Sequence, residues 1–201
     1  MSVLGPVALL RDHFIKAMVA LLLLQGVLVV LPPWGMGTPL EPGLALPTWL
    51  GFLPAALLAI LVQTSAEEVL FRGYIQQQLA ARIPHPVVWM GLPSIIFGMA
   101  HYAPDAAGDY ALLVAIWACV FGLLMADLTA RSGSLGPAIA VHFVNNAFAM
   151  LVISVPDDLF GLALYVTPFS MHDTAEVARW LPVDFGVMLV SWLAVRLAIK
   201  R

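Results

Sequence analysis

Residues 47–74 read PTWLGFLPAALLAILVQTSAEEVLFRGY, and this stretch decides the fold. Residues 47–66 form an uncharged apolar run that is long enough for a helix to cross a lipid bilayer. Two adjacent carboxylates, Glu67 and Glu68, and the cation of Arg72 follow at once. Because ionisable groups beside hydrocarbon are costly, they are usually paired or functional. The stretch therefore predicts a membrane helix that carries a polar site near its end.

The overall composition agrees with a membrane protein. Of the 201 residues, 62% are hydrophobic and 10% are charged, whereas a soluble domain usually carries about 25% charged residues. The net charge of −3 gives no basis for a nucleic-acid partner. The single cysteine, Cys119, excludes a disulfide framework or a metal knuckle of several cysteines.

Six apolar segments have the length and hydropathy of membrane helices. They are residues 14–32, 47–80, 87–101, 110–130, 135–154 and 180–199. We therefore predict an all-α fold, a polytopic transmembrane bundle of about six helices, with a seventh or eighth allowed. Residues 47–80 are too long for one perpendicular crossing, so we expect this helix to tilt, break or pass the membrane surface. Residues 158–170 are expected to be interfacial, re-entrant or a seventh span.

The whole chain, residues 1–201, is expected to form a single integral-membrane domain, because it contains no repeat, low-complexity tract or long linker. The first apolar run is followed by no small-x-small cleavage motif. We expect it to be kept as the first helix rather than removed as a signal peptide.

Charged residues predict the orientation in the membrane. Basic residues fall at alternate ends of the predicted spans: Arg11, Lys16, Arg82, Arg131, Arg196, Lys200 and Arg201. The opposite ends carry Glu41, Asp105, Asp109, Asp157, Asp158, Asp173 and Glu176, with Arg179 as the exception. By the positive-inside rule, we expect a multi-pass protein of the cell (inner) membrane with both termini in the cytoplasm.

Helical geometry separates the two glutamates. Glu68 and Arg72 are four residues apart, so they share a helix face and can form an ion pair. Glu67 lies about 100° around the helix from Glu68 and is poorly placed for Arg72. The stretch is therefore expected to hold one structural ion pair and one spare carboxylate.

Two later apolar segments also carry polar side chains. Residues 87–102 contain His101, and residues 134–154 contain His142, Asn145 and Asn146. His142 and Asn146 are four residues apart and share a helix face, with Asn145 close to it. Counted along the helices, Glu67, His101 and His142 reach similar depths, so we expect them to meet in one site.

Such a site suits hydrolysis of an amide bond by activated water. A partly buried carboxylate can act as the general base, and one histidine can hold the water. A second histidine and an asparagine amide can stabilise the oxyanion. The alternative is a metal site, with Glu67, His101 and His142 as three ligands. A proton-coupled transporter would also place carboxylates in a membrane, but it explains neither the asparagine one turn after a histidine nor Arg72.

Three ordered motifs resemble a known family. EEVLFR, FGMAH and HFVNN are similar to the EExxxR, FxxxH and HxxxN motifs of the CPBP family, the CAAX protease and bacteriocin-processing group of intramembrane endopeptidases. The resemblance covers a core of about residues 45–152. It implies an intramembrane protease of the type II CAAX prenyl endopeptidase kind.

The resemblance also implies roles for individual residues. Glu67 would activate the water and His101 would help to position it, while His142 and Asn146 would form the oxyanion hole. Glu68 and Arg72 would support the site, and we add Asn145 to the supporting residues.

The expected cofactor and partners follow from the same resemblance. No HExxH motif is present, so we favour glutamate-activated water and no cofactor, with zinc as the alternative. Expected partners are the lipid bilayer and a membrane-anchored protein or peptide. The candidates are a prenylated CAAX-like protein, a bacteriocin-like precursor, or a C-terminal sorting tail of the myxosortase kind. A membrane immunity or binding protein of the same fold that does not cut is the non-enzyme alternative.

Overall fold

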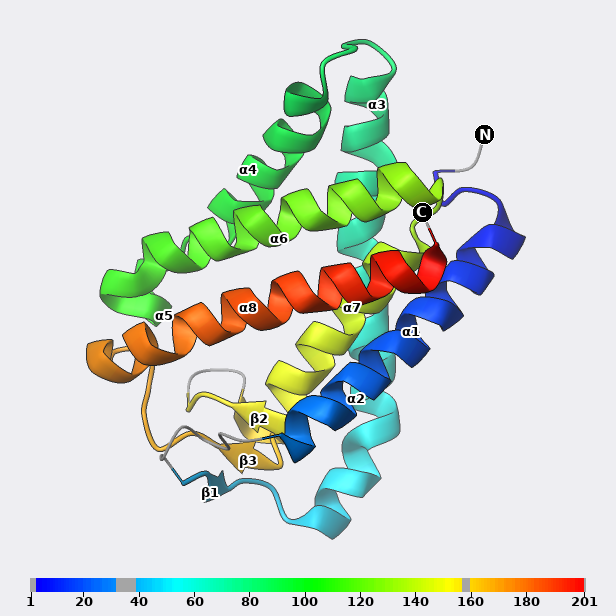
Figure 1. The fold of residues 1–201 in the computed structure, drawn as a ribbon. Coiled ribbons are helices and arrows are strands. Elements are labelled where there is room, and N and C mark those ends of the chain that lie inside the picture. The colour runs from blue at the N-terminus through cyan, green and yellow to red at the C-terminus, as the bar shows by residue number, and fades with distance from the viewer. Residues whose placement is uncertain (1–2, 32–38, 157–159, 201) are drawn as a thin grey trace.

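The computed structural model describes residues 3–31, 39–156 and 160–200 of the chain, and these residues form a bundle of six main helices (Figure 1). In chain order the helical elements are α1 (Val7–Val30), α2 (Leu46–Glu68), η2 (Val69–Gln76), α3 (Gln77–Ala80), η3 (Val87–Gly91), α4 (Leu92–Ala100), α5 (Pro104–Ala107), η4 (Gly108–Tyr110), α6 (Ala111–Ser132), α7 (Gly136–Ala147), η5 (Phe148–Val152), η6 (Phe160–Leu162) and α8 (Thr174–Ile199).

Four helices are long and apolar enough to cross a membrane: Val7–Val30, Leu46–Ala80, Pro104–Ser132 and Thr174–Ile199. Two further apolar helices, Val87–Ala100 and Gly136–Val152, are shorter. The protein is therefore a multi-pass membrane protein, and the prediction of an all-α bundle is confirmed.

Helix boundaries differ from the prediction where the ends are polar. The last helix begins at Thr174 rather than at residue 180, because the Asp173 side chain accepts a hydrogen bond from Glu176 N and caps its first turn. Because this first turn is polar, a prediction based only on apolar residues does not include it in the helix. Residue 32 of the first predicted span and the charges Asp157, Asp158 and Arg201 lie outside the described residues.

The second helix runs unbroken from Leu46 to Ala80, so a break, one of the three expected alternatives, does not occur. Its winding changes instead. Residues Val69–Gln76 are π-helical, directly after the two glutamates. π-helical turns are wider than α-helical turns and are frequent at functional sites.

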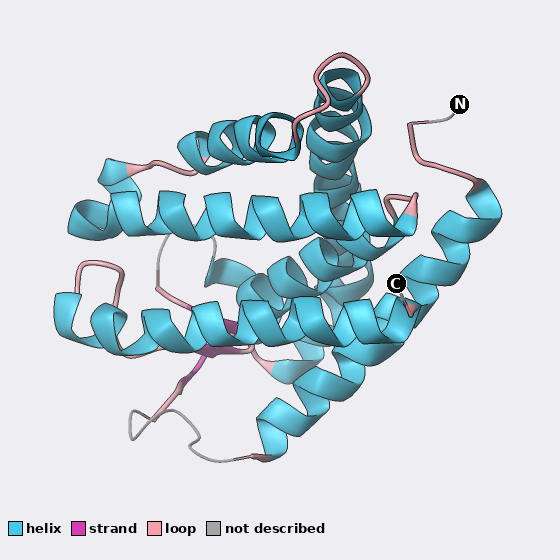
Figure 2. Ribbon diagram, turned by 45° about the horizontal axis from the view of Figure 1, so that its top comes forward, coloured by secondary structure: helices cyan, strands magenta, loops and turns pink. Residues whose placement is uncertain are grey.

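A small sheet joins three loops at one end of the bundle (Figure 2). Strand β3 (Tyr165–Val166) lies between β1 (Glu41–Pro42), to which it is antiparallel, and β2 (Ile153–Ser154), to which it is parallel. The described part of 158–170 thus forms a helical turn and a strand, so the possibility of a seventh span here is wrong. Strands of two residues carry no periodicity by which a sequence could reveal them.

Helix α7 is the centre of the packing and contacts α1, α2, α6 and α8 (Figure 1). Its first residues are small and buried. Gly136 lies so close to α1 that a Cβ atom there would approach Phe14 N to 2.9 Å. Small residues let membrane helices pack closely, and this α7 surface brings His142 into the protein interior.

Helix α4 is held against α6 by another close approach. A Cβ atom on Gly98 would lie 2.6 Å from Ala115 O and 2.9 Å from Cys119 Cβ, both on α6. Gly98 stands three residues before His101, so this contact fixes the position of that histidine.

We predict that Gly98→Ala destabilises the protein by about 1–3 kcal/mol, because the added methyl group overpacks the α4–α6 contact. The thermal midpoint measured in detergent should fall by several degrees. Gly26→Ala is the matched control, since a Cβ atom there meets nothing within 4 Å. Equal midpoints for the two variants would contradict the prediction.

Candidate active site

The buried carboxylate of Glu68 ties the second helix to α7. Its Oε1 atom accepts hydrogen bonds from Arg72 Nη1 at 2.9 Å and from His142 Nδ1 at 2.8 Å. The exposed fractions of the three side chains are 0%, 2% and 4% in that order. The Glu68–Arg72 pair was predicted from its spacing, whereas the bond to His142 was not. Glu68 thus links the EExxxR segment to the HxxxN segment.

A row of buried polar side chains continues from this point along the second helix. The row consists of four buried residues at intervals of four: Thr64, Glu68, Arg72 and Gln76. In an α-helix, residues at this interval drift about 40° per step around the axis. The wider π-helical turns of Val69–Gln76 offset that drift. Gln76 completes the row by donating to Ala126 O of α6 at 3.1 Å.

The contact with Glu68 determines which nitrogen of His142 carries hydrogen. A carboxylate oxygen only accepts, so Nδ1 is the donor in this bond. The other nitrogen, Nε2, faces Glu67 Oε2 at 3.8 Å. A neutral ring held this way offers a lone pair at Nε2, and a doubly protonated ring offers a hydrogen there.

Glu67 occupies a different environment from Glu68, as the helical spacing predicted. Its side chain is 30% exposed. Its Oε1 atom accepts a hydrogen bond from Gln63 Nε2. Its Oε2 atom is buried and receives no hydrogen bond from the described residues. Glu67 therefore presents one satisfied oxygen and one available oxygen.

The two asparagines form a short chain of side-chain amides. Asn146 Nδ2 donates to Gln63 Oε1 at 3.3 Å, and Asn145 Nδ2 donates to Asn146 Oδ1 at 3.4 Å. Gln63 thus contacts both Glu67 and Asn146. These contacts join helices α2 and α7, and we call the line of contact between the two helices the seam.

His101 joins the site through an aromatic ring. Its Nδ1 atom donates to Phe97 O at 2.8 Å, and its imidazole lies 4.5 Å from the Phe97 ring between centroids. The centroid of the Phe97 ring also lies 6.0 Å from that of the His142 ring and 4.7 Å from the Arg72 guanidinium carbon. Among the described residues, His101 forms no hydrogen bond or ion pair with Glu67 or His142. The three motif segments therefore meet around Phe97.

The arrangement does not fit a metal ion held by Glu67, His101 and His142. Across residues 3–31, 39–156 and 160–200, no three His, Cys, Asp or Glu side chains converge in a way that could hold a metal ion. Glu67 approaches His142, but His101 is turned toward the backbone of its own helix.

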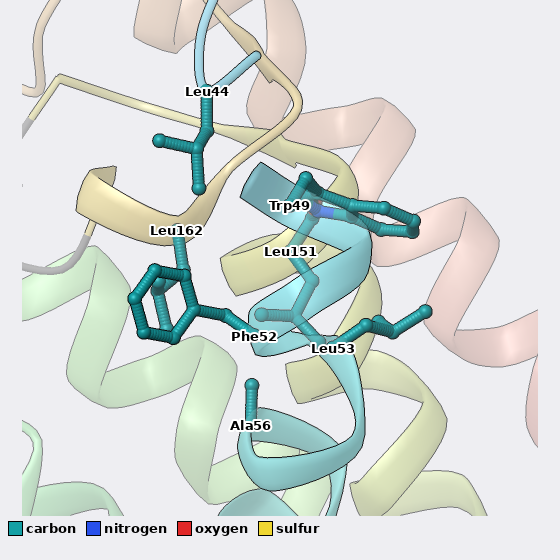
Figure 3. A pocket seen from close by; sticks show the side chains of 7 residues that line it. All are labelled: Leu44, Trp49, Phe52, Leu53, Ala56, Leu151 and Leu162. Atoms are coloured by element: carbon teal, nitrogen blue, oxygen red, sulfur yellow. The ribbon is translucent and has the colours of Figure 1, made fainter. Parts of the chain in front are cut away.

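An apolar pocket lies further along the same seam, toward the start of α2 (Figure 3). Trp49 closes one side by donating its indole N–H to Leu151 O at 2.8 Å. Ala56, Gln63 and Glu67 are seven and four residues apart, so the pocket and the carboxylate share one face of α2. The lining residues are Leu44, Trp49, Phe52, Leu53, Ala56, Leu151 and Leu162.

The sequence-based prediction missed two residues that organise the site, Gln63 and Phe97. Gln63 was detectable, because it is a polar residue in an apolar run, one turn before Glu67. Phe97 belongs to the FxxxH motif, but nothing in an apolar helix distinguishes a packing phenylalanine from one that supports two histidines.

Comparisons with known proteins agree with the motifs. The family model described as "Type II CAAX prenyl endopeptidase Rce1-like" matches residues 49–148. The chain carries an Rce1-like CAAX endopeptidase domain of the CPBP family. All three motif segments fall inside the matched range.

A similar protein supports this domain without adding an activity. The uncharacterized protein YyaK of Bacillus subtilis (strain 168) is 30% identical over 113 residues, which cover 56% of this chain and 37% of that protein. The chain therefore spans little more than a third of the length of this relative. No solved structure matches the chain.

We predict that Arg72→Met lowers stability by about 3–5 kcal/mol, because it leaves the buried Glu68 carboxylate without its cation. Arg179→Met is the control. Arg179 is 52% exposed and pairs with Glu176 at 3.3 Å, and exposed pairs contribute about 0–1 kcal/mol. Thermal unfolding in detergent measures both variants. A midpoint for Arg72→Met within the range of the control would show that the buried pair does not hold the helices together.

Proposed function

We propose that the protein is an intramembrane endopeptidase that cleaves a membrane-anchored protein or peptide with water activated by Glu67. One observation carries this proposal. Glu67 Oε2 and His142 Nε2 face each other at 3.8 Å. This distance is too long for a direct hydrogen bond and suits a shared water. Asn146 stands one helical turn after His142 and beside Gln63.

The mechanism that we propose uses no covalent intermediate. Glu67 removes a proton from the water, and the oxygen attacks the carbonyl carbon of the scissile peptide bond. The negative charge develops on the carbonyl oxygen, where His142 Nε2–H and the Asn146 amide donate hydrogen bonds. Glu67 then transfers its proton to the leaving nitrogen as the carbon–nitrogen bond breaks.

His101 and the supporting residues each have a defined task in this proposal. Glu68 orients the His142 ring through Nδ1 and places a negative charge beside a doubly protonated ring, while Arg72 balances the Glu68 carboxylate. His101, whose Nδ1 donates to Phe97 O, has Nε2 left to accept a hydrogen bond from the water. Asn145 donates to Asn146 and fixes the orientation of that amide.

The bond between Glu68 and His142 favours a second mechanism for the same reaction. A neutral His142 oriented by Glu68 could remove the proton from water through Nε2, as in a carboxylate–histidine pair. Glu67 would then serve only as an electrostatic element. The two mechanisms assign different consequences to the loss of the Glu67 carboxylate.

We propose three substrate classes for this site: a prenylated CAAX-like protein, a bacteriocin-like precursor and a C-terminal sorting tail. In each class an apolar anchor holds the scissile bond at the membrane.

We predict that Glu67→Gln and Asn146→Ala each reduce cleavage by a factor of about 10² or more, because they remove the base and an oxyanion donor. The assay uses purified protein in lipid vesicles with one anchored reporter peptide from each substrate class. Glu41→Gln is the control, since Glu41 lies in strand β1 at the end of the bundle.

The outcomes separate the competing proposals. Nearly full activity of Glu67→Gln, together with loss of activity in His142→Ala, would favour His142 as the base. Normal cleavage by all three variants would contradict the protease proposal. Binding of a reporter without cleavage by the wild-type protein would favour the immunity or binding protein.

We also propose that both termini are cytoplasmic. The start of α1 and the ends of α6 and α8 lie at one end of the bundle (Figure 1). Leu135 N donates to Leu4 O at 3.2 Å and joins two of these ends. This end carries Arg11, Arg131 and Arg196, as the positive-inside rule requires of a cytoplasmic face.

We predict that a reporter active only in the cytoplasm is active when fused to either terminus and inactive when inserted after Asp105. Asp105 lies in α5 at the opposite end of the bundle. A reporter active only outside the cytoplasm should give the reverse pattern. Activity of the second reporter at the C-terminus would overturn the orientation.

A further inference from the structure

We propose that Gln63 is a positioning residue whose side-chain amide connects the water-activating carboxylate of Glu67 to the oxyanion donor Asn146. Gln63 belongs to none of the three motifs. Its Nε2 atom donates to Glu67 Oε1, and its Oε1 atom accepts from Asn146 Nδ2 at 3.3 Å. This inference rests on the proposed peptidase function and goes further by assigning a role to a residue outside the expected set.

The Glu67 carboxylate determines the direction of the whole chain of hydrogen bonds. An ionised carboxylate has no hydrogen to donate, so the amide of Gln63 must turn its NH₂ group toward Glu67. Its carbonyl oxygen then faces Asn146, and only the NH₂ group of Asn146 can satisfy it. The carbonyl oxygen of Asn146 consequently faces Asn145 Nδ2 at 3.4 Å.

With the hydrogen bonds in this direction, Glu67 keeps one carboxylate oxygen and Asn146 keeps one N–H hydrogen for the reaction. Glu67 Oε1 is occupied by Gln63, so Oε2, the atom 3.8 Å from His142 Nε2, is the oxygen that meets the water. An amide NH₂ group has two hydrogens. Asn146 uses one on Gln63 and keeps the second for the oxyanion. Without Gln63, the Asn146 amide could turn its carbonyl oxygen toward the substrate, and the Glu67 carboxylate could turn away from the water.

The surroundings of Gln63 argue against a packing role. It is an exposed residue on a helix whose neighbouring residues Leu61 and Val62 are apolar. A side-chain amide beside lipid is unfavourable unless its polar atoms have partners. Gln63 has partners at both ends of its amide, and both belong to the proposed reaction.

Two substitutions separate positioning from packing. Gln63→Met keeps the length of the unbranched side chain and suits an apolar environment, but it forms neither hydrogen bond. Gln63→Glu keeps the shape and replaces the donor to Glu67 by a second carboxylate. Gln78→Met is the matched control, because Gln78 is an exposed glutamine further along the same helix whose side chain hydrogen-bonds to Arg82 and to no residue of the proposed site.

Gln63→Met should lose activity without losing stability. We expect kcat to fall roughly 10- to 100-fold, as misplacement of reacting groups does. KM for the cleaved reporter should stay within about twofold, because no uniform substrate contact is removed. The thermal midpoint should be unchanged or higher. Gln63→Glu should lose at least as much activity, and Gln78→Met should retain wild-type kcat.

A spectroscopic measurement reads the contact without relying on turnover. The infrared difference between wild-type protein and Glu67→Gln isolates the stretching band of the Glu67 carboxylate. The band should move in the Gln63→Met background, because its hydrogen-bond donor is gone, and should stay in place with Gln78→Met.

Each result supports or overturns the inference. Wild-type kcat in Gln63→Met, or an unmoved carboxylate band, overturns the role of Gln63 and leaves the peptidase function intact. A fall in kcat matched by a fall in the thermal midpoint overturns positioning in favour of a structural role. A wild-type protein that cleaves none of the three reporters overturns the proposed function, and the inference falls with it.

Discussion

The buried carboxylate of Glu68 is the constraint on which the rest of the structure depends. One oxygen accepts from Arg72 within its own helix and from His142 on α7. Breaking a buried pair leaves an uncompensated charge, so neither partner can leave without a large cost in free energy. The charge that would be a liability in a membrane interior therefore fixes the register between two helices. Glu67, one residue earlier, is left available for chemistry.

Spacing along the chain predicted what lies within one helix. The intervals of four residues predicted the Glu68–Arg72 pair and the shared face of His142 and Asn146, because residues four apart lie close together on a helix. The bond between Glu68 and His142 joins residues 74 positions apart, and no periodicity encodes such a contact. Depth along the helices led us to expect Glu67, His101 and His142 in one site, but depth could not show that His101 packs against Phe97, which in turn lies beside His142.

The seam between α2 and α7 is held at both ends by different interactions. At one end the link is ionic, from Glu68 to His142. At the other end Trp49 donates to Leu151 O, and strand β3 pairs with β1 before α2 and with β2 after η5. Gln63 and Asn146 lie between these two attachments. The two-residue strands were invisible in the sequence, yet they limit how far the helices can separate around the site.

The π-helical segment Val69–Gln76 makes chain length, as well as composition, a sensitive property of this region. A π-helical turn holds more residues than an α-helical turn, so deleting one residue would let the segment rewind as an α-helix. Arg72 and Gln76 would then rotate away from the faces that they now occupy, although nearly every side chain was still present.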